Sequence, residues 1–336
     1  MAPTPEPDAA FHERHSSTVR RSHPGRNPER SGPRARTVIV VRTVASAGST
    51  STDTSEAAVD TGSSTDTLSV PCLPGAPSWV SLLAHDPPAA RAFYGPLLGW
   101  SFERASGERS HYTIASVQGV PVAGISSLPS RGHFSATWTT FFGVTDVDAA
   151  ARRVRERMGT VGVGPVRAWA GRIAIATDPE GAVFGLWQGQ VGPVRQLPLP
   201  GAPSWIELAT DAFAAALFYG NVLDWAAYDA EHLDMAWEHE RVVLRVEGQE
   251  IAALRTAELF STAIPVRPHW HISFSVEDLE HSVVHALRLG GVLVSSLTST
   301  PYGETAALQD PEGAPFSLIS APKAPESAPK APEPDR

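Results

Sequence analysis

The stretch Leu73-Pro-Gly-Ala-Pro-Ser-Trp79 occurs a second time, at Leu199-Pro-Gly-Ala-Pro-Ser-Trp205. Each copy is followed by the tripeptide Phe-Tyr-Gly, at 93–95 and 218–220, and later by Asp-Pro-Glu-Gly-Ala, at 178–182 and 310–314. Landmarks that recur in the same order over such long intervals indicate a duplicated domain, because solenoid repeats are only about 20–50 residues long. The chain is therefore expected to contain two copies of one domain.

The flanking segments have a different composition from the two copies. Residues 1–72 are rich in Arg, Pro and Ser and show little apolar periodicity, which predicts a disordered extension. An alternative is that the eight arginines from Arg14 to Arg42 form a basic arm that binds an acidic partner. A linker at 191–200 and a Pro-rich disordered tail at 322–336 then delimit two domains, 73–190 and 201–321.

Composition narrows the class of protein. The 336 residues carry a net charge of -9, which argues against a nucleic-acid partner. No apolar run approaches the ~20 residues of a membrane helix, so no membrane partner is expected. Cys72 is the single cysteine and cannot form an internal disulfide, which fits a reducing, cytoplasmic location.

Each copy shows the same order of patterns: a strand, a helix and three strands, twice over. Helices are predicted after Asp86, Asp146 and Asp211 and at 279–289, because apolar residues recur at helical spacing behind a capping residue. In the second of them the predicted buried stripe runs from Val147 to Met158. The predicted strands are 79–84, 100–103, 111–117, 121–126, 138–144, 161–166, 172–177, 182–188, 205–209, 225–228, 241–246, 250–255, 269–276, 292–296, 305–309 and 315–320.

With these landmarks the chain resembles the vicinal oxygen chelate superfamily, which includes glyoxalases, extradiol dioxygenases and bleomycin-resistance proteins. The resemblance covers about residues 75–190 and 201–321. It implies an α+β fold of two tandem domains, each a pair of βαβββ modules forming a cupped, eight-stranded mixed sheet. The ligand is expected inside the cup.

Enzymes of this superfamily hold a divalent metal with His, Gln and Glu side chains from four strands, and a metal needs three or four such donors. The matching positions in the first copy are Trp79, Gly124, Thr139 and Gly185. Those in the second copy are Ser204 or Trp205, Ala253, His271 and Ser317. Only His271 is a suitable donor, so no metal and no other cofactor is predicted, and a divalent metal is the alternative.

The remaining candidates are catalytic and ligand-binding side chains. Glu207 and His271 form a candidate acid–base pair, because imidazole titrates near neutral pH, or they are inert cavity lining. His281 and His285 lie one helical turn apart and suggest zinc, although a solvated helix face fits them better. The candidate ligand-binding residues are Trp79, Ser81, Thr139, Phe141, Trp187, Trp205, His269 and Ser317.

Flat aromatic walls suit planar ligands, although tryptophan also simply fills a core. Trp138 and Trp270 are expected to pack beneath the helices.

The leading hypothesis is a metal-free protein that binds a small, aromatic secondary metabolite or antibiotic. The alternatives are an enzyme, either metal-independent through Glu207 and His271 or a metal-dependent glyoxalase or dioxygenase, and an interaction module. The two domains are expected to pair within a monomer or in a homodimer.

Overall fold

The computed structural model describes residues 72–105, 112–128, 135–168, 171–190, 199–225, 233–239, 241–256, 268–300 and 302–320. These residues all belong to one compact unit, Val38–Arg336. Residues 1–71 of the predicted extension, most of the predicted linker, the predicted tail and most of the predicted strand at 225–228 lie outside the described residues. Cys72, predicted as the end of the extension, is buried. Within the described part, no helix has the length and apolar character that crossing a membrane requires.

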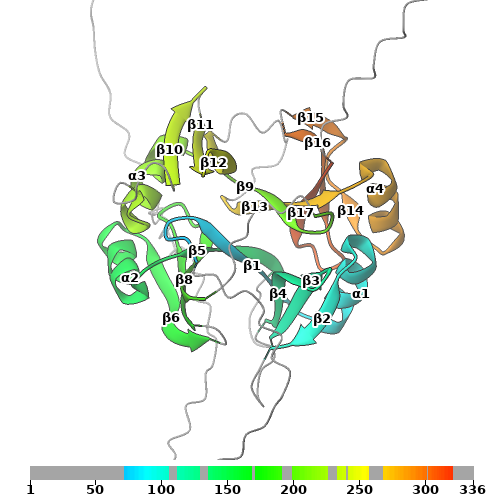
Figure 1. The fold of residues 1–336 in the computed structure, drawn as a ribbon, viewed down its shortest axis with the longest axis horizontal. Helices are drawn as coiled ribbons and strands as arrows, with labels where there is room; N and C mark the ends of the chain where they lie inside the picture. The colour runs from blue at the N-terminus through cyan, green and yellow to red at the C-terminus, as the bar shows by residue number, and fades with distance from the viewer. Residues whose placement is uncertain are drawn as a thin grey trace, which may run out of the picture. The chain divides into compact units, whose positions relative to one another are not determined.

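The first copy folds as two βαβββ modules that share one mixed sheet (Figure 1). The sheet order is β2-β3-β4-β1-β5-β8-β7-β6, with β1 and β5 side by side at the centre. Its elements are β1 (Pro77–Ala84), α1 (Pro87–Leu98), β2 (Ser101–Arg104), β3 (Thr113–Val117), β4 (Val120–Ser127), β5 (Thr137–Gly143), α2 (Val147–Glu156), β6 (Thr160–Ala168), β7 (Gly171–Thr177) and β8 (Val183–Gly189).

The second copy repeats this topology in the order β10-β11-β12-β9-β13-β17-β16-β14. In the described residues a short extra strand, β15, pairs with β16 and makes nine strands rather than the predicted eight. Its elements are β9 (Pro203–Thr210), α3 (Ala212–Val222), β10 (Leu233–Glu238), β11 (Arg241–Val246), β12 (Gln249–Thr256), β13 (Trp270–Val276), α4 (Leu279–Arg288), β14 (Val292–Leu293), β15 (Thr298–Thr300), β16 (Gly303–Gln309) and β17 (Pro315–Ser320).

The helices begin where the capping residues predict. Asp86 accepts a hydrogen bond from the backbone N–H of Ala89, and Pro87 occupies the first helical position of α1. Asp146, Asp211 and Asp278 cap α2, α3 and α4 in the same way. Each cap satisfies backbone donors that the first helical turn leaves without intrahelical partners.

One contiguous core joins the two copies, and the repeated landmarks build it. The Tyr94 hydroxyl of the first copy donates to Asp310 of the second at 3.1 Å, and Tyr219 donates to Asp178 at the same distance. Each hydroxyl also accepts a bond from a tryptophan, Trp138 or Trp270, at 3.0 Å. Trp138 and Trp270 therefore lie in the shared core, as predicted.

The opening stretches also contact the opposite copy. The Trp100 indole donates to the carbonyl of Gly201, and the Trp225 indole donates to that of Gly75, both at 2.8 Å. Gly75 and Gly201 both have a positive φ, which glycine adopts without strain. Through Gly75 and Gly201, the duplicated motif therefore closes the contact between the two copies.

Two element predictions are corrected. Met158 is 82% exposed rather than part of the buried stripe, because α2 ends at Glu156 and Met158 has a left-handed backbone conformation, φ 68°. The sequence analysis also missed the edge strand β10, whose Asp234 and Glu238 alternate with apolar residues. These carboxylates pair with an arginine on the neighbouring strand, which a local pattern does not reveal.

Candidate functional site on the second sheet

Each sheet has one face on the shared core and one opposite face, which we call its cup face. Strand register defines the two cup faces, because side chains opposite each other on paired strands point to the same side. The first cup face carries Trp79, Ser81, Gly124, Thr139, Phe141, Gly185 and Trp187. The second carries Trp205, Glu207, Ala253, His271, Ser273 and Ser317.

The first cup face is filled by its own side chains. Trp79, Phe141 and Trp187 are almost completely buried in a small cluster that also contains Cys72 and Ile175. The rings of Phe141 and Trp187 meet edge to face with centroids 5.9 Å apart. Five predicted ligand contacts therefore lie together here, Ser81 and Thr139 included, but the aromatic ones are packed against one another.

The donor set of the first cup face does not fit a divalent ion. Among Trp79, Gly124, Thr139 and Gly185, only Thr139 has a side-chain oxygen, and a hydroxyl is a poor substitute for imidazole or carboxylate. Aromatic rings also fill the space in front of both glycines. A β-carbon at Gly185 would lie 2.0 Å from the Phe141 ring, and one at Gly124 would lie 1.8 Å from the Tyr112 hydroxyl.

The second cup face combines an aromatic stack with charged groups. The rings of Trp205 and Tyr302 stack with centroids 4.2 Å apart and planes tilted by 24°. The Arg241 guanidinium lies over the Tyr302 ring, 5.3 Å from its centroid. Such stacking and cation–π contacts are those by which proteins hold flat, electron-rich molecules.

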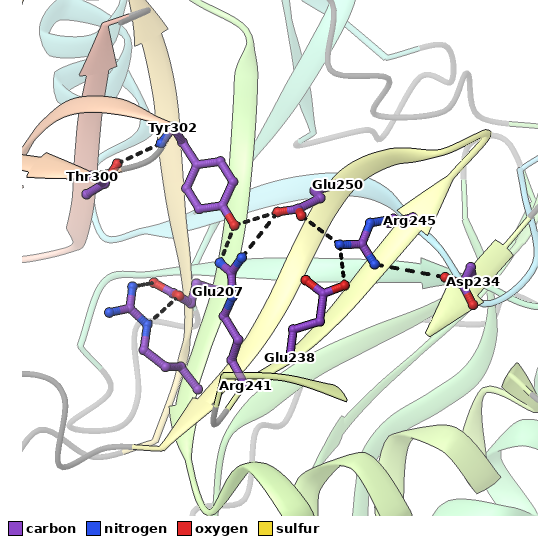
Figure 2. A network of polar contacts seen from close by, with 9 residues as sticks. Glu207, Asp234, Glu238, Arg241, Arg245, Glu250, Thr300 and Tyr302 are labelled. Atoms are coloured by element: carbon purple, nitrogen blue, oxygen red, sulfur yellow. Dashed lines mark hydrogen bonds and ion pairs between the residues drawn. The ribbon is translucent and has the colours of Figure 1, made fainter. Parts of the chain in front are cut away.

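A network of arginines and carboxylates extends from Tyr302 along the neighbouring strands (Figure 2). Arg245 on β11 contacts Glu250 at 2.8 Å and Glu238 at 2.7 Å. The Tyr302 hydroxyl donates to Glu250 and accepts from Arg241. These side chains keep part of their surface exposed, from 19% for Arg245 to 34% for Glu238, so water or a ligand can reach them.

The network shifts the ionisation of two of its members. Desolvation disfavours the charged form of Glu250, but hydrogen bonds from Tyr302 and Arg245 outweigh it and lower its pKa. Desolvation, followed by the bond to Glu250, raises the pKa of Tyr302 to about 12. Near neutral pH the network therefore contains a carboxylate and a neutral phenol.

The candidate acid–base pair faces this network. Glu207 and His271 are register partners on β9 and β13, so their side chains lie on the same face. Both carboxylate oxygens of Glu207 accept from Arg255, at 2.8 and 3.1 Å, whereas His271 shares a 2.7 Å hydrogen bond with Ser317. Desolvation, together with the neighbouring His269, lowers the pKa of His271 to about 3. The imidazole is therefore neutral in ordinary buffers.

The described residues contain no group of three or more His, Cys, Asp or Glu side chains that could hold a metal ion. At the second cup face, His271 is a suitable nitrogen ligand, but the Glu207 carboxylate is held by Arg255. Ala253 offers no donor, and Ser317 offers only a hydroxyl. This donor set does not fit a divalent metal.

The other histidine and arginine clusters lie away from the cup faces. The rings of His281 and His285 are 6.3 Å apart on the outer side of α4, with His281 exposed. Arg153 donates to the carbonyl of Val222 at the end of α3, where the helix dipole stabilises a positive charge. The arginine-rich face of α2 is otherwise largely exposed.

The sequence analysis missed most of the charged network. Arg241, Arg245, Arg255 and Glu250 lie on β11 and β12. The available local signal was the even spacing of Arg241 and Arg245, which places both on one face of a strand. Tyr302 comes from the turn before β16, and only the folded chain brings it onto Trp205.

Comparisons with known proteins agree with this architecture. Residues 77–186 match a family model described as the Glyoxalase/Bleomycin resistance protein/Dioxygenase superfamily, and residues 205–319 match a glyoxalase-like domain. The anthracycline biosynthesis protein DauV of Streptomyces sp. (strain C5) is 33% identical over 271 residues, which cover 75% of this chain and 95% of that protein.

Two further relatives span almost the same region. The anthracycline biosynthesis protein DnrV of Streptomyces peucetius is 33% identical over 73% of this chain and 93% of its own length. CFP32 of Mycobacterium tuberculosis (strain CDC 1551 / Oshkosh), whose name suggests a glyoxylase, is 31% identical over 73% of this chain and 94% of its own length. The predicted resemblance is thereby confirmed, and the chain belongs to the glyoxalase/bleomycin resistance protein/dioxygenase superfamily, with two of its domains in tandem.

Proposed function

We propose that the protein binds a small aromatic secondary metabolite on the second cup face, without a metal, and acts in the biosynthesis or sequestration of an anthracycline-like compound. The names of DauV and DnrV, both 33% identical over nearly their whole length, support this ligand class. Anthracyclines are flat fused-ring quinones whose ketone and phenol oxygens accept hydrogen bonds.

The observation that carries this proposal is the contrast between the cup faces. The first holds a closed aromatic cluster, whereas the second presents the Trp205–Tyr302 stack beside partly exposed arginines. A flat ring system can extend or replace that stack. The guanidinium groups of Arg241 and Arg255 lie on the same face and can donate to its oxygens.

The test is a fluorescence titration of the full chain with an anthracycline. Tyr302→Leu removes the stack and should weaken binding at least about tenfold, which corresponds to a loss of ~1.4 kcal/mol of binding free energy. Arg172→Met is the matched control, because it breaks an arginine–carboxylate pair, with Asp148, in the first domain. Circular dichroism confirms that each variant is folded.

The proposal predicts unchanged affinity after treatment with a chelator. Absence of binding by the wild-type protein, or equal binding by the Tyr302→Leu variant and the control, would show that the second cup face is not the ligand site. A loss of affinity on chelation that added metal restores would overturn the metal-free part.

A second candidate function is acid–base catalysis on the same ligand. His271 favours it, because a neutral imidazole beside Glu207 can accept a proton from a bound phenol or an acidic C–H group. Its pKa of about 3 makes it a weak base, so binding remains the first proposal. His271→Gln should abolish any turnover detected by mass spectrometry and leave the dissociation constant within about twofold.

A further inference from the structure

The aromatic ring of Tyr112 lies on the first cup face, held as a phenol. Its hydroxyl accepts a hydrogen bond from the Trp79 indole at 2.7 Å and donates one to the Ser81 hydroxyl at 3.1 Å. Desolvation raises the pKa of Tyr112 to about 12, so the group held there is neutral. The face thus supplies one donor and one acceptor, which together match the two roles of a phenolic hydroxyl.

Gly124 makes room for this phenol. A β-carbon at this position would lie 1.8 Å from the Tyr112 hydroxyl oxygen and 2.2 Å from the ring carbon that bears it. The backbone of Gly124 is not among those with a positive φ, so conformation does not require glycine here. In the second sheet, Ala253 occupies the corresponding register position and carries a β-carbon there.

A second polar atom on this face is not used by Tyr112. Thr139 is the register partner of Ser81, and its side chain points to the same side of the sheet. Thr139 is 1% exposed, and within the described ranges its hydroxyl has no hydrogen-bond partner. Buried hydroxyls are normally bonded, so this one indicates a polar group that the tyrosine does not supply.

We propose that the first cup face is a binding site for a phenolic ring, and that Tyr112 occupies it as a tethered surrogate which a phenolic ligand displaces. Trp79 and Ser81 recognise the hydroxyl, Gly124 leaves space for the ring edge, and Thr139 bonds a second oxygen of the ligand. Tyr112 immediately precedes β3 and lies outside the central strands β1 and β5, so displacement of its ring leaves those two strands paired. This site is independent of the one proposed on the second sheet.

The experiment uses the full chain labelled with 5-fluorotryptophan and titrated with 1,8-dihydroxyanthraquinone. The fluorine resonance of Trp79, assigned with Trp79→Phe, reports only on the first sheet. Tyr112→Phe keeps the packing but removes both hydrogen bonds of the surrogate. The variant should therefore bind the probe at least about fivefold more tightly than wild type at this resonance, since each net hydrogen bond changes an equilibrium by roughly that factor and two are removed.

Three further variants define the site. Ser81→Ala in the Tyr112→Phe background should reverse the gain, and Thr139→Val should weaken binding about fivefold. Gly124→Ala should abolish binding, because its methyl group fills the slot. Arg172→Met, which breaks the pair with Asp148, is the control and should leave the Trp79 titration unchanged.

The proposal is overturned if the Trp79 resonance does not respond to the probe in either wild type or Tyr112→Phe. It is also overturned if Tyr112→Phe binds no more tightly than wild type, which would make Tyr112 a fixed part of the core. The outcome does not depend on whether an anthracycline binds the second sheet.

Discussion

Thr140 is a single residue whose buried hydroxyl lowers the stability of the folded protein. It is fully buried opposite Val80, on the core side of β5, and its hydroxyl has no hydrogen-bond partner among the described residues. Valine has nearly the same shape without the hydroxyl. Thr140→Val should raise the free energy of unfolding by about 1 kcal/mol, because a buried hydroxyl without a partner is unfavourable. Urea denaturation measures this change, and a lower midpoint would contradict it.

His271 should make the free energy of unfolding decrease as the pH falls. Its pKa is lowered to about 3 in the folded protein, against about 6.5 in an unfolded chain. Between these values the unfolded state binds a proton that the folded state does not. The stabilisation is therefore complete above about pH 6.5 and is lost progressively as the pH falls toward 3.

The variant His271→Gln removes this contribution. The free energy of unfolding from urea titrations at pH 7, 6, 5 and 4 should fall less steeply for His271→Gln than for wild type. His281→Gln, on the exposed face of α4, is the control. Identical slopes for wild type and His271→Gln would show that the imidazole is not desolvated.

At the scale of one element, α1 depends on the opposite copy for its start. The carboxylate of Glu312 accepts hydrogen bonds from the backbone N–H groups of His85 and Asp86, at 2.7 and 2.6 Å. These groups directly precede the helix. The turn Asp-Pro-Glu-Gly of the second copy therefore fixes the entry of the chain into the first helix.

Glu312→Ala should lower the free energy of unfolding by about 1 kcal/mol, since the contacts are exposed and water replaces part of the loss. Glu280→Ala, in the first turn of α4, is the matched control and should have a smaller effect, because Asp278 already caps that helix. Thermal melts compare the two variants. Equal shifts in the melting temperatures of the two variants would mean that Glu312 stabilises the protein only through its charge and not through these hydrogen bonds.

At the scale of the molecule, the two copies should unfold together. Tyr94 and Tyr219 each join a tryptophan of their own copy to an aspartate of the other. Desolvation raises the pKa of both phenols well above its ordinary value, and it also raises the pKa of Asp178 and Asp310. These contacts lie in the core that both sheets share.

Tyr94→Phe should cost about 1–3 kcal/mol, because it leaves Asp310 and the Trp138 indole without their buried partner. Tyr219→Phe should cost a similar amount by the same argument. Calorimetry should show one cooperative transition, shifted to lower temperature, for each variant. Two separate transitions would indicate that the copies fold independently.

The sequence by itself determined the duplication, the α+β class and most strands and helices. Repeated landmarks, capping aspartates and apolar periodicity are local signals, and each reflects a local cause such as backbone capping or alternation about a sheet. The resemblance to the superfamily's ligand positions pointed to His271 and Ser317, and alternation along the strand added Glu207, two residues after Trp205. The strand β10 was missed because its charged side chains are explained only by Arg245 on the next strand.

The tertiary structure decided what occupies each cup face. Tyr112 and Tyr302 lie outside the motifs, in segments next to strand ends, and reach Trp79 and Trp205 only when the sheet has formed. Arg255 on β12 likewise donates to the carboxylate of Glu207 on β9, which lies 48 residues earlier in the chain. Such contacts depend on the distances between side chains that are remote in sequence, and the chain order does not contain those distances. This is why one sequence pattern, repeated twice, produces a closed aromatic face in one copy and a charged, partly open face in the other.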